Sequence, residues 1–515
     1  MDRKRSVLNV GVALLSKVIL LITALFVRRL LIQYIGNTVN GLNSLYASII
    51  GVLSVAELGV GSAITFSMYS PIISGDKRKV AALYCLYRKL YRIIGAVILG
   101  AGLACMPFLP MLIGDYDNLD INVYVPFFLT LVSVVISYLY SAKTSLIIAY
   151  KDNYLTTGIL TVSRLLRYGL QIAVILIWRS YTVFLICQII ETLMVWGLTE
   201  AAVRRKHGDI VAMHESVDQK TKTEVGRNIK AMFMHKIGTI MVNTVDSLVI
   251  SGFIGVVALG KYSNYAAIAS VMAGVIGLFF SPLTSVVGHV CAKGDTERTK
   301  QYFHRFYCMN FILGIVFFLG YYAVIDSLVV LFFGTGLSVS RVIIYTITLN
   351  QFITYMRRTC LLFRDASGTF YNDRWKPVAE GVANLFLSLL FVRLFPEEYR
   401  IVGVIVATII TSLLICHIVE PFVVFRHVFG QSSGGFCIKN YTYIALFAAC
   451  AFAMTWLIHT YDSAVVSVLV NGSLSLAVSA AAFGFLMAVD SVFRTDALAL
   501  FRAVPSWLGR LARRS

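Results

Sequence analysis

Runs of 18 or more apolar residues follow one another along almost the whole chain, separated by short clusters of charge. A helix of about 20 apolar residues crosses the roughly 30 Å hydrocarbon core of a bilayer. The sequence therefore predicts an all-α polytopic membrane protein with about fourteen transmembrane helices. Their approximate spans are 8–31, 43–69, 92–113, 123–149, 155–178, 182–203, 231–254, 262–289, 306–332, 341–363, 377–395, 401–425, 441–460 and 464–490.

The composition excludes an ordinary soluble fold. Hydrophobic residues make up 58% of the chain and charged residues 14%, whereas a soluble domain carries about 25% charged residues. One soluble core could not bury so much apolar surface. The nine cysteines include no C-x-x-C pair, so neither a disulfide framework nor a zinc site is predicted.

The net charge of +19 comes from an uneven distribution of the 45 Lys and Arg residues. With the N-terminus placed inside and the loops assigned alternately, most of these residues fall on the inner side. The outer loops are poor in basic residues and partly acidic, as in GDYDNLD (114–120) and FPEEYR (395–400). This asymmetry follows the positive-inside rule and predicts that both termini are cytoplasmic. The positive charge thus reflects topology and attraction to anionic membrane lipids, and no nucleic-acid partner is predicted.

Two pairs of similar segments indicate an internal repeat. IGNTVNGLNSLYASI (35–49) aligns without gaps with IGVVALGKYSNYAAI (254–268) at an offset of 219. YKDNY (150–154) resembles YNDRW (371–375) at an offset of 221. Two matches in the same order at nearly one offset are difficult to attribute to chance, so the repeat is taken as the basis of the architecture.

The predicted spans separating the repeat copies are even in number, so both halves enter the membrane in the same direction. We therefore expect two six-helix lobes related by a pseudo-two-fold axis along the membrane normal, with a substrate site between them. The predicted domains are an N-terminal lobe (1–203), a cytoplasmic linker (204–230), a C-terminal lobe (231–425), two appended transmembrane helices (426–490) and a basic cytoplasmic tail (491–515).

Polar residues recur at helical spacing in the span 155–178, which places them on one helix face. An ionisable residue at bilayer depth normally faces a polar cavity or a partner. A helix pair joined by hydrogen bonds would explain the Thr or Gln residues alone, but two arginines one turn apart repel each other unless an anion lies near them. The pattern favours a cavity wall, with the polar residues Thr157, Thr161, Arg164, Arg167, Tyr168 and Gln171.

Lys17 and Lys236 occupy equivalent positions in the two repeat copies, each in the inner half of its span. Either lysine could extend its side chain so that the charge reaches the membrane–water interface. For Lys236, this explanation is as good as a position in a cavity. Lys17 lies deeper and is the better cavity candidate. Arg357, Arg358 and Arg364 gather at the inner end of their span, as topology signals or as a basic entrance.

Glu57 lies in the middle of a span that is rich in small residues. Its carboxyl group is expected either to pair with a cation such as Lys17 or to be held protonated, because a low dielectric disfavours the charged form. Asp246 poses the same choice. His289 and His417 are equally consistent with hydrogen-bonded core residues and with proton carriers.

The sequence contains no motif that predicts an enzyme. It has no G-x-x-x-x-G-K-[ST], no H-E-x-x-H and no G-x-S-x-G in a strand-turn-helix context. No cofactor and no metal site are predicted. Transport by this chain would therefore depend on a gradient or on later consumption of the product.

Three segments, 41–95, 260–290 and 363–391, resemble bacterial polysaccharide flippases. Their superfamily also contains multidrug and toxin extruders and the lipid II flippase. The resemblance implies alternating-access translocation of an undecaprenyl-pyrophosphate-linked oligosaccharide from the inner to the outer leaflet, for O-antigen, capsule or a related polymer. It also implies the bacterial cytoplasmic (inner) membrane, with a polysaccharide polymerase and chain-length machinery as partners.

Charge and depth suggest how such a substrate would bind. Lys17 and Lys236 would draw in the pyrophosphate, and Arg164 and Arg167 would hold it at mid-depth through charge-assisted hydrogen bonds. Three alternatives stay open: a cation-coupled multidrug extruder, for which an acidic cavity is expected, a lipid II flippase, and a non-transporting assembly partner of a polymerase.

Overall fold

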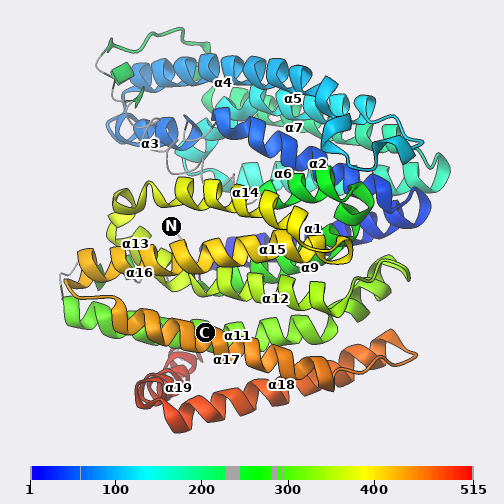
Figure 1. Ribbon diagram of the computed structural model, residues 1–515. Helices are drawn as coiled ribbons and strands as arrows, with labels where there is room; N and C mark the ends of the chain where they lie inside the picture. The colour runs from blue at the N-terminus through cyan, green and yellow to red at the C-terminus, as the bar shows by residue number, and fades with distance from the viewer. Residues whose placement is uncertain are drawn as a thin grey trace. The chain divides into compact units, whose positions relative to one another are not determined.

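The computed structural model describes residues 3–57, 60–219, 221–223, 225–226, 244–280, 287–288, 290–291 and 295–512. The chain divides into two compact units, Met1–Gly260 and Lys261–Ser515. All regular secondary structure in the described residues is helical (Figure 1). The all-α class predicted from the sequence is therefore confirmed.

The first unit is a bundle of long helices. Within it, α5 packs against both α4 and α7, and α6 packs against α7 and α1. Its helices are α1 (Arg3–Tyr34), α2 (Asn37–Leu53), α3 (Val60–Ile73), α4 (Lys77–Cys105), α5 (Tyr124–Ala149), α6 (Asn153–Ile177) and α7 (Tyr181–Ala212), followed by the first residues of α9 (Val256–Phe280).

The second unit is built around α11, which contacts α12, α18 and α19. A cluster of phenylalanine and tyrosine rings centred on Phe303 and Tyr307 fills the space beside α11. The helices of this unit after α9 are α11 (Thr296–Phe333), α12 (Arg341–Met356), α13 (Arg358–Ser367), α14 (Lys376–Leu394), α15 (Arg400–Thr411), α16 (His417–Val424), α17 (Gly434–Leu457), α18 (Ala464–Val489) and α19 (Ser491–Ala512).

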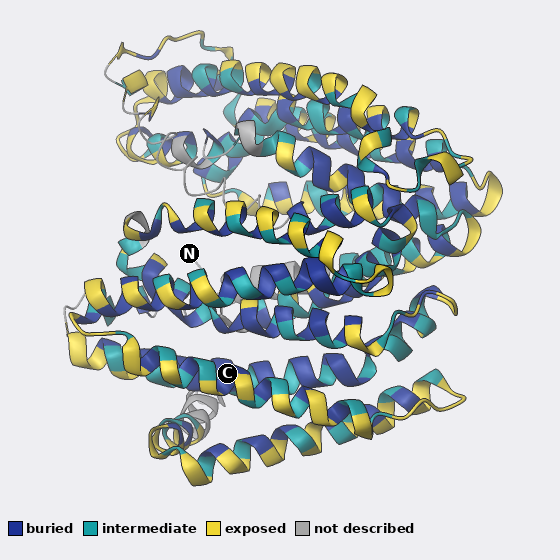
Figure 2. Cartoon of the chain, viewed as in Figure 1, coloured by how far each residue is buried: buried dark blue, intermediate teal, exposed yellow. Residues whose placement is uncertain are grey.

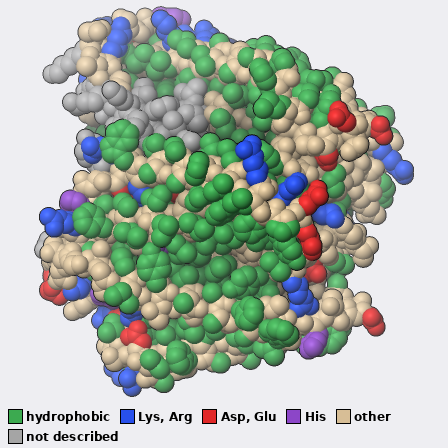
Figure 3. All heavy atoms as spheres, viewed as in Figure 1, with side chains coloured by type: hydrophobic (Ala, Val, Ile, Leu, Met, Phe, Trp, Pro, Cys, Tyr) green, Lys and Arg blue, Asp and Glu red, His purple; other side chains and the backbone are tan. Residues whose placement is uncertain are grey.

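The part of the chain that the structure describes contains nine helices long and apolar enough to cross a membrane. Figure 2 shows that these helices keep exposed sides, and Figure 3 shows hydrophobic side chains spread over the visible face of the second unit. Helix α18 illustrates the pattern, because its buried stripe is largely small and polar, with Ser467, Asn471 and Ser475, while Leu469 and Leu476 are exposed. An apolar exposed face suits lipid rather than water. The chain is a polytopic membrane protein.

Two predicted spans are interrupted rather than continuous. The span predicted at 43–69 is broken, because α2 ends at Leu53 and a 3₁₀ turn follows over Ser54–Glu57. The span predicted at 341–363 is divided at Arg357, between α12 and α13. Irregular backbone at membrane depth is tolerated where it is buried in protein or lines a polar cavity. Both breaks meet that condition, since Glu57 lines a cavity and Arg357 is surrounded by carboxylates.

The repeat predicted from the sequence has a structural counterpart in the turns that precede α2 and α9. Gly36 and Gly255, which align at the offset of 219, have φ angles of 119° and 120°. Only glycine adopts this conformation readily. The matched backbone supports the repeat, while the axis that relates the predicted lobes stays a prediction.

Two aligned stretches, Asn37–Gly41 and Val256–Gly260, also lie against each other within the first unit. A Cβ atom added to Gly41 would lie 1.9 Å from the backbone oxygen of Val256, and one added to Gly260 would lie 2.6 Å from that of Asn37. These two contacts exchange under the repeat, because Asn37 aligns with Val256 and Gly41 with Gly260. Small residues allow such close helix approach.

The last helix, α19, occupies most of the segment predicted as a basic tail. Phe493 is 1% exposed and contacts the rings of Phe311, Tyr443 and Phe483. The predicted domain boundaries at 203, 230 and 425 were drawn from the charged linker and the sequence repeat. The division into two compact units does not test these boundaries, so they stay a prediction.

Candidate functional site

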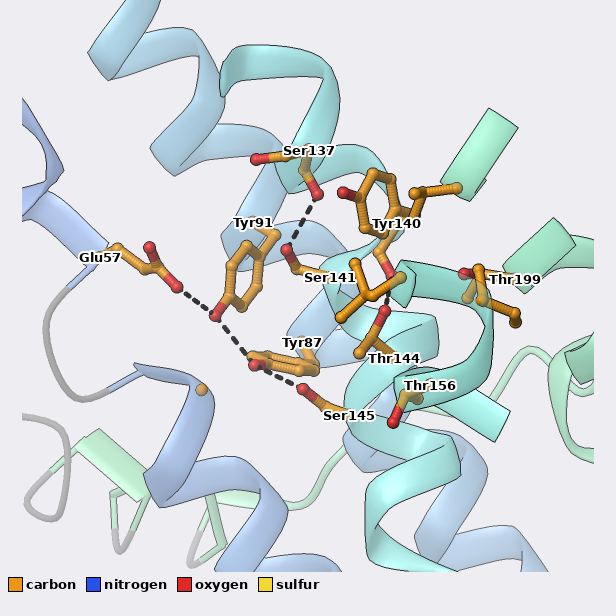
Figure 4. A pocket seen from close by; sticks show the side chains of 14 residues that line it. Glu57, Tyr87, Tyr91, Ser137, Tyr140, Ser141, Thr144, Ser145, Thr156 and Thr199 are labelled. Atoms are coloured by element: carbon orange, nitrogen blue, oxygen red, sulfur yellow. Dashed lines mark hydrogen bonds between the residues drawn. The ribbon is translucent and has the colours of Figure 1, made fainter. Parts of the chain in front are cut away.

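The first unit contains a polar cavity of about 470 Å³. Six elements line it, and they contribute mostly hydroxyl-bearing side chains: the 3₁₀ turn after α2, and helices α3, α4, α5, α6 and α7 (Figure 4). The lining residues are Glu57, Gly61, Tyr87, Tyr91, Ser137, Tyr140, Ser141, Thr144, Ser145, Thr156, Ile159, Leu160, Val195 and Thr199. Glu57 is the only ionisable acid or base among these lining residues, tyrosine hydroxyls apart.

A chain of hydrogen bonds leads from α5 to Glu57. The Ser145 hydroxyl donates to the Tyr87 hydroxyl at 3.0 Å, Tyr87 donates to Tyr91 at 2.9 Å, and Tyr91 donates to Oε1 of Glu57 at 2.9 Å (Figure 4). Tyr87 and Tyr91 lie one turn apart on α4, so both rings point to the same side. The break after α2 brings the carboxylate of Glu57 to the end of this chain.

Gly61 keeps space for the two tyrosines. A Cβ atom at this position would lie 2.7 Å from the Tyr87 hydroxyl oxygen and 2.8 Å from that of Tyr91. These distances are shorter than any van der Waals contact, so a side chain here would displace the two hydroxyl groups. The absence of a side chain at Gly61 is thus part of the geometry that presents Tyr91 to Glu57.

The two arginines predicted on α6 meet a carboxylate from α7. Nη1 of Arg167 lies 3.0 Å from Oε2 of Glu191, and Nε of Arg164 lies 3.6 Å from Oε1 of the same residue. Glu191 is buried, whereas half of the Arg164 side chain is exposed. The anion that the sequence required near the arginine pair is therefore supplied, at least in part, by the protein. The three residues together retain one positive charge.

This arginine cluster lies near the polar cavity. On α6, Arg164 follows the cavity-lining residue Leu160 by one helical turn, and on α7, Glu191 precedes the cavity-lining residue Val195 by one turn. Tyr168 and Gln171, the other predicted residues on α6, serve local contacts: the Arg167 guanidinium lies 4.8 Å from the centroid of the Tyr168 ring, and Gln171 donates to the backbone oxygen of Phe184 at 3.3 Å. The structure thus brings Arg164 and Arg167 together near the cavity and places Gln171 in a helix contact.

Other predicted residues are placed only in part. Lys17 lies in α1, but its side chain falls outside the described atoms, and Lys236 and His289 lie outside the described residues. Asp246 is 8% exposed. His417 is hydrogen-bonded through Nε2 to the backbone oxygen of Ile353 and through Nδ1 to Asn440, which is the core arrangement that the sequence left open.

A buried cluster of charges lies in the second unit, where α12 meets α14 and α16. Arg357 contacts Glu420 at 2.7 Å and Glu380 at 3.1 Å, and Lys376 contacts Glu420 at 2.5 Å. The four side chains are between 1% and 13% exposed. Arg357 is consequently engaged inside the protein and cannot form a basic entrance.

Arg364 is also paired. Its guanidinium contacts Asp373 and Asp365, each at 2.7 Å. Burial alone would lower the pKa of Arg364, but the two neighbouring carboxylates raise it above its usual value. Of the three arginines in the predicted basic entrance, two are thus held in internal ion pairs.

Sequence reasoning missed Glu191, Tyr87 and Tyr91. Glu191 is a charged residue inside the predicted span 182–203, and that alone could have identified it as a partner for the arginines. The spacing of Tyr87 and Tyr91 on one helix face was also visible. Their connection to Glu57 depends on the helix break, which no local pattern indicated.

No protein-family model and no curated protein sequence matches this chain. Several solved structures, however, are similar to it in fold. The chain is similar to the lipid II flippase MurJ in an inward closed conformation, with a TM-score of 0.63 and 14% identity, covering 92% of this chain and 99% of that one. It is also similar to a multidrug resistance MATE family transporter of the MOP superfamily in an inward-facing conformation, with a TM-score of 0.57, 12% identity and coverage of 82% and 95%.

A third similar structure is a MOP superfamily transporter from Pyrococcus furiosus, described by a reverse polarity of its binding pocket. The TM-score is 0.51 at 11% identity, with coverage of 88% of this chain and 97% of that one. At such low identities the likeness concerns the fold alone. The similar chains are matched over nearly their full length, so the fold of this all-α polytopic membrane protein is that seen in transporters of the MOP superfamily.

Proposed function

We propose that this protein is a transporter that moves an undecaprenyl-pyrophosphate-linked oligosaccharide from the inner to the outer leaflet by alternating access. The observation that carries the proposal is the arginine cluster of Arg164, Arg167 and Glu191, which lies within two helices long and apolar enough to span a membrane, on a fold shared with MurJ and MATE transporters. A pyrophosphate is a dense anion, and guanidinium groups are suitable donors for it. The lipid tail can stay in the bilayer while the headgroup crosses.

The rest of the assignment follows from the predicted topology and resemblance. The protein would lie in the bacterial cytoplasmic membrane with both termini inside, and it would act in surface polysaccharide synthesis with a polymerase and chain-length machinery. Lys17 and Lys236 would attract the pyrophosphate at the inner side. The chain would carry no enzymatic activity of its own, which agrees with the transporters among the similar structures.

The leaflet distribution of the lipid-linked oligosaccharide tests the proposal. An impermeant glycan-directed label is applied to spheroplasts with and without the gene. We expect loss of outer-leaflet oligosaccharide and inner-leaflet accumulation when the gene is absent. An unchanged oligosaccharide distribution together with loss of outer-leaflet lipid II would instead assign lipid II as the substrate, which the likeness to MurJ makes the first alternative.

Removing the arginine charges should reduce export. In the double variant Arg164→Gln with Arg167→Gln, we expect the rate of outer-leaflet appearance to fall by about tenfold or more, because two charge-assisted contacts to the pyrophosphate are lost. A matched control is Arg78→Gln with Lys79→Gln, which removes the same charge from two exposed residues. Equal export by both double variants at equal protein level would remove the arginines from the mechanism.

The cavity at Glu57 favours a second feature, coupling to a cation gradient. Glu57 accepts a hydrogen bond from Tyr91 and has no ion-pair partner among the described residues. An ionisable residue inside a transmembrane segment is a candidate for the pathway of a coupling ion. Coupling would also suit a multidrug extruder, which is the second candidate function.

Glu57→Gln should uncouple transport from the gradient. We expect this variant to flip substrate at the same rate with and without an imposed proton or sodium gradient, whereas the wild-type rate increases with the gradient. Tyr87→Phe is the control, because it lies one hydrogen bond farther from the carboxylate. If wild-type cells exclude cationic dyes and Glu57→Gln cells do not, the multidrug function is preferred.

A further inference from the structure

A second cavity in the first unit shares no lining residue with the cavity at Glu57. It has a volume of about 850 Å³ and lies between α4, α5 and α7. Its lining residues are Tyr84, Arg88, Lys143, Leu193, Trp196, Gly197, Glu200, Arg204, Gly208, Val211 and Ala212. Three of them are cationic and one is anionic, so the cavity carries an excess of positive charge.

The carboxylate of Glu200 is already engaged. It forms an ion pair with Lys143 and accepts a hydrogen bond from Nε of Arg204 at 2.6 Å. Arg88 has no carboxylate partner among the described residues, and its guanidinium lies 5.8 Å from the centroid of the Tyr84 ring. The positive charge of Arg88 is therefore available to a ligand.

An unsatisfied hydrogen-bonding group lies in the same place. Tyr84 is 0% exposed, and its hydroxyl has no hydrogen-bond partner within the described part of the chain. A buried hydroxyl without a partner costs free energy, so such a group normally has a protein, water or ligand neighbour. A phosphate oxygen in the cavity could accept from Tyr84 and from Arg88 together.

The other wall of the cavity is apolar and open. Leu193 is 46% exposed, and Trp196 lies three residues farther along α7. Tryptophan is typical of the boundary between headgroups and hydrocarbon. The cationic residues lie toward the start of α4 and the ends of α5 and α7, which is the end of the bundle predicted to be cytoplasmic.

We propose that this cavity binds the phosphate group of an anionic phospholipid from the inner leaflet. Arg88 and Tyr84 contact the phosphate, Lys143 and Arg204 supply further positive charge, and Leu193 and Trp196 contact the glycerol and upper acyl chain. The apolar wall favours a lipid over a free anion. The site is independent of the proposed transport function.

Native mass spectrometry of the full-length, delipidated protein tests this site. Phosphatidylglycerol and phosphatidylcholine are added at equal concentration to the wild type, to Arg88→Gln and to Arg205→Gln, an exposed arginine outside the cavity. We expect the wild type and Arg205→Gln to retain phosphatidylglycerol in preference to phosphatidylcholine. In Arg88→Gln the phosphatidylglycerol affinity should fall about tenfold, with phosphatidylcholine unchanged, because one charge-assisted contact is lost.

Three outcomes would overturn the proposal. An equal loss in Arg88→Gln and Arg205→Gln would indicate general surface charge. Displacement of the bound lipid signal by millimolar inorganic phosphate, without a preference for phosphatidylglycerol, would indicate a free-anion site. Full phosphatidylglycerol binding by both Arg88→Gln and Tyr84→Phe would leave the cavity without a role. Melting temperatures of all variants are measured in parallel, and Tyr84→Phe keeps the test decisive if Arg88→Gln does not fold.

Discussion

Replacing Glu420 with glutamine should destabilise the second unit by about 3–5 kcal/mol, which is the usual cost of leaving buried charge without its partner. Glu420 is 1% exposed and is contacted by both Arg357 and Lys376. Without its charge, only Glu380 remains to balance these two cations. Nearly all of the variant protein should therefore aggregate or be degraded, since such a loss is a large part of the stability of a domain.

Thermal unfolding of the purified protein in detergent measures this effect, with yield as a second readout. The control is Asp209→Asn, which breaks the ion pair between Asp209 and Lys77 at the exposed ends of α7 and α4. Exposed pairs contribute little, so the control should melt like the wild type. Equal melting temperatures for Glu420→Gln and the wild type would show that the buried cluster does not stabilise the unit.

Gly41→Ala should have the second large effect. The new methyl group would lie 1.9 Å from the backbone oxygen of Val256, and backbone atoms cannot move aside as a flexible side chain can. Within the first unit, the start of α9 at Val256–Gly260 would have to move away from α2, which removes the close packing at this contact. We expect a loss of at least about 1–3 kcal/mol, the range for overpacked contacts.

Two comparisons make this prediction specific. Gly158→Ala on α6 meets no heavy atom within 4 Å, so it should be neutral or slightly stabilising, as an alanine in an open helix position usually is. Gly260→Ala should resemble Gly41→Ala, and the double variant should cost less than the two losses combined, because the first change already separates the helices. Thermal unfolding of all four variants checks the series, and an unaffected Gly41→Ala would contradict the close crossing.

The sequence predicted the class of the fold because hydrophobicity is a property of each segment alone. A run such as 464–490 needs only its own length and composition to identify a membrane helix, and α18 occupies nearly the same residues. The repeat could also be detected in the sequence, because the turns before α2 and α9 need a backbone angle that few residues other than glycine adopt. Gly36 and Gly255 therefore occupy matching positions.

The candidate site was only partly predictable, because its contacts join distant segments. The face of α6 with Arg164 and Arg167 followed from helical spacing, but the position of Glu191 beside it depends on how α6 packs against α7. The environment of Glu57 depends on a helix break that apolar composition conceals. At Arg357, the charge pattern fitted a topology signal as well as a basic entrance, and only the fold brings Glu380 and Glu420 to it.

Flipping by the purified protein tests the central claim most directly. The protein is reconstituted into proteoliposomes with a fluorescent undecaprenyl-pyrophosphate-linked oligosaccharide, and an impermeant quencher reports the fraction of substrate in the outer leaflet over time. The proposed function predicts that more than half of the fluorescence is quenched only in vesicles that contain protein, because substrate from the inner leaflet then reaches the outer leaflet. The Arg164→Gln, Arg167→Gln variant should slow the quenching of this inner-leaflet half. Identical quenching in protein-free and protein-containing vesicles, with folded protein and an imposed gradient, would contradict the proposal.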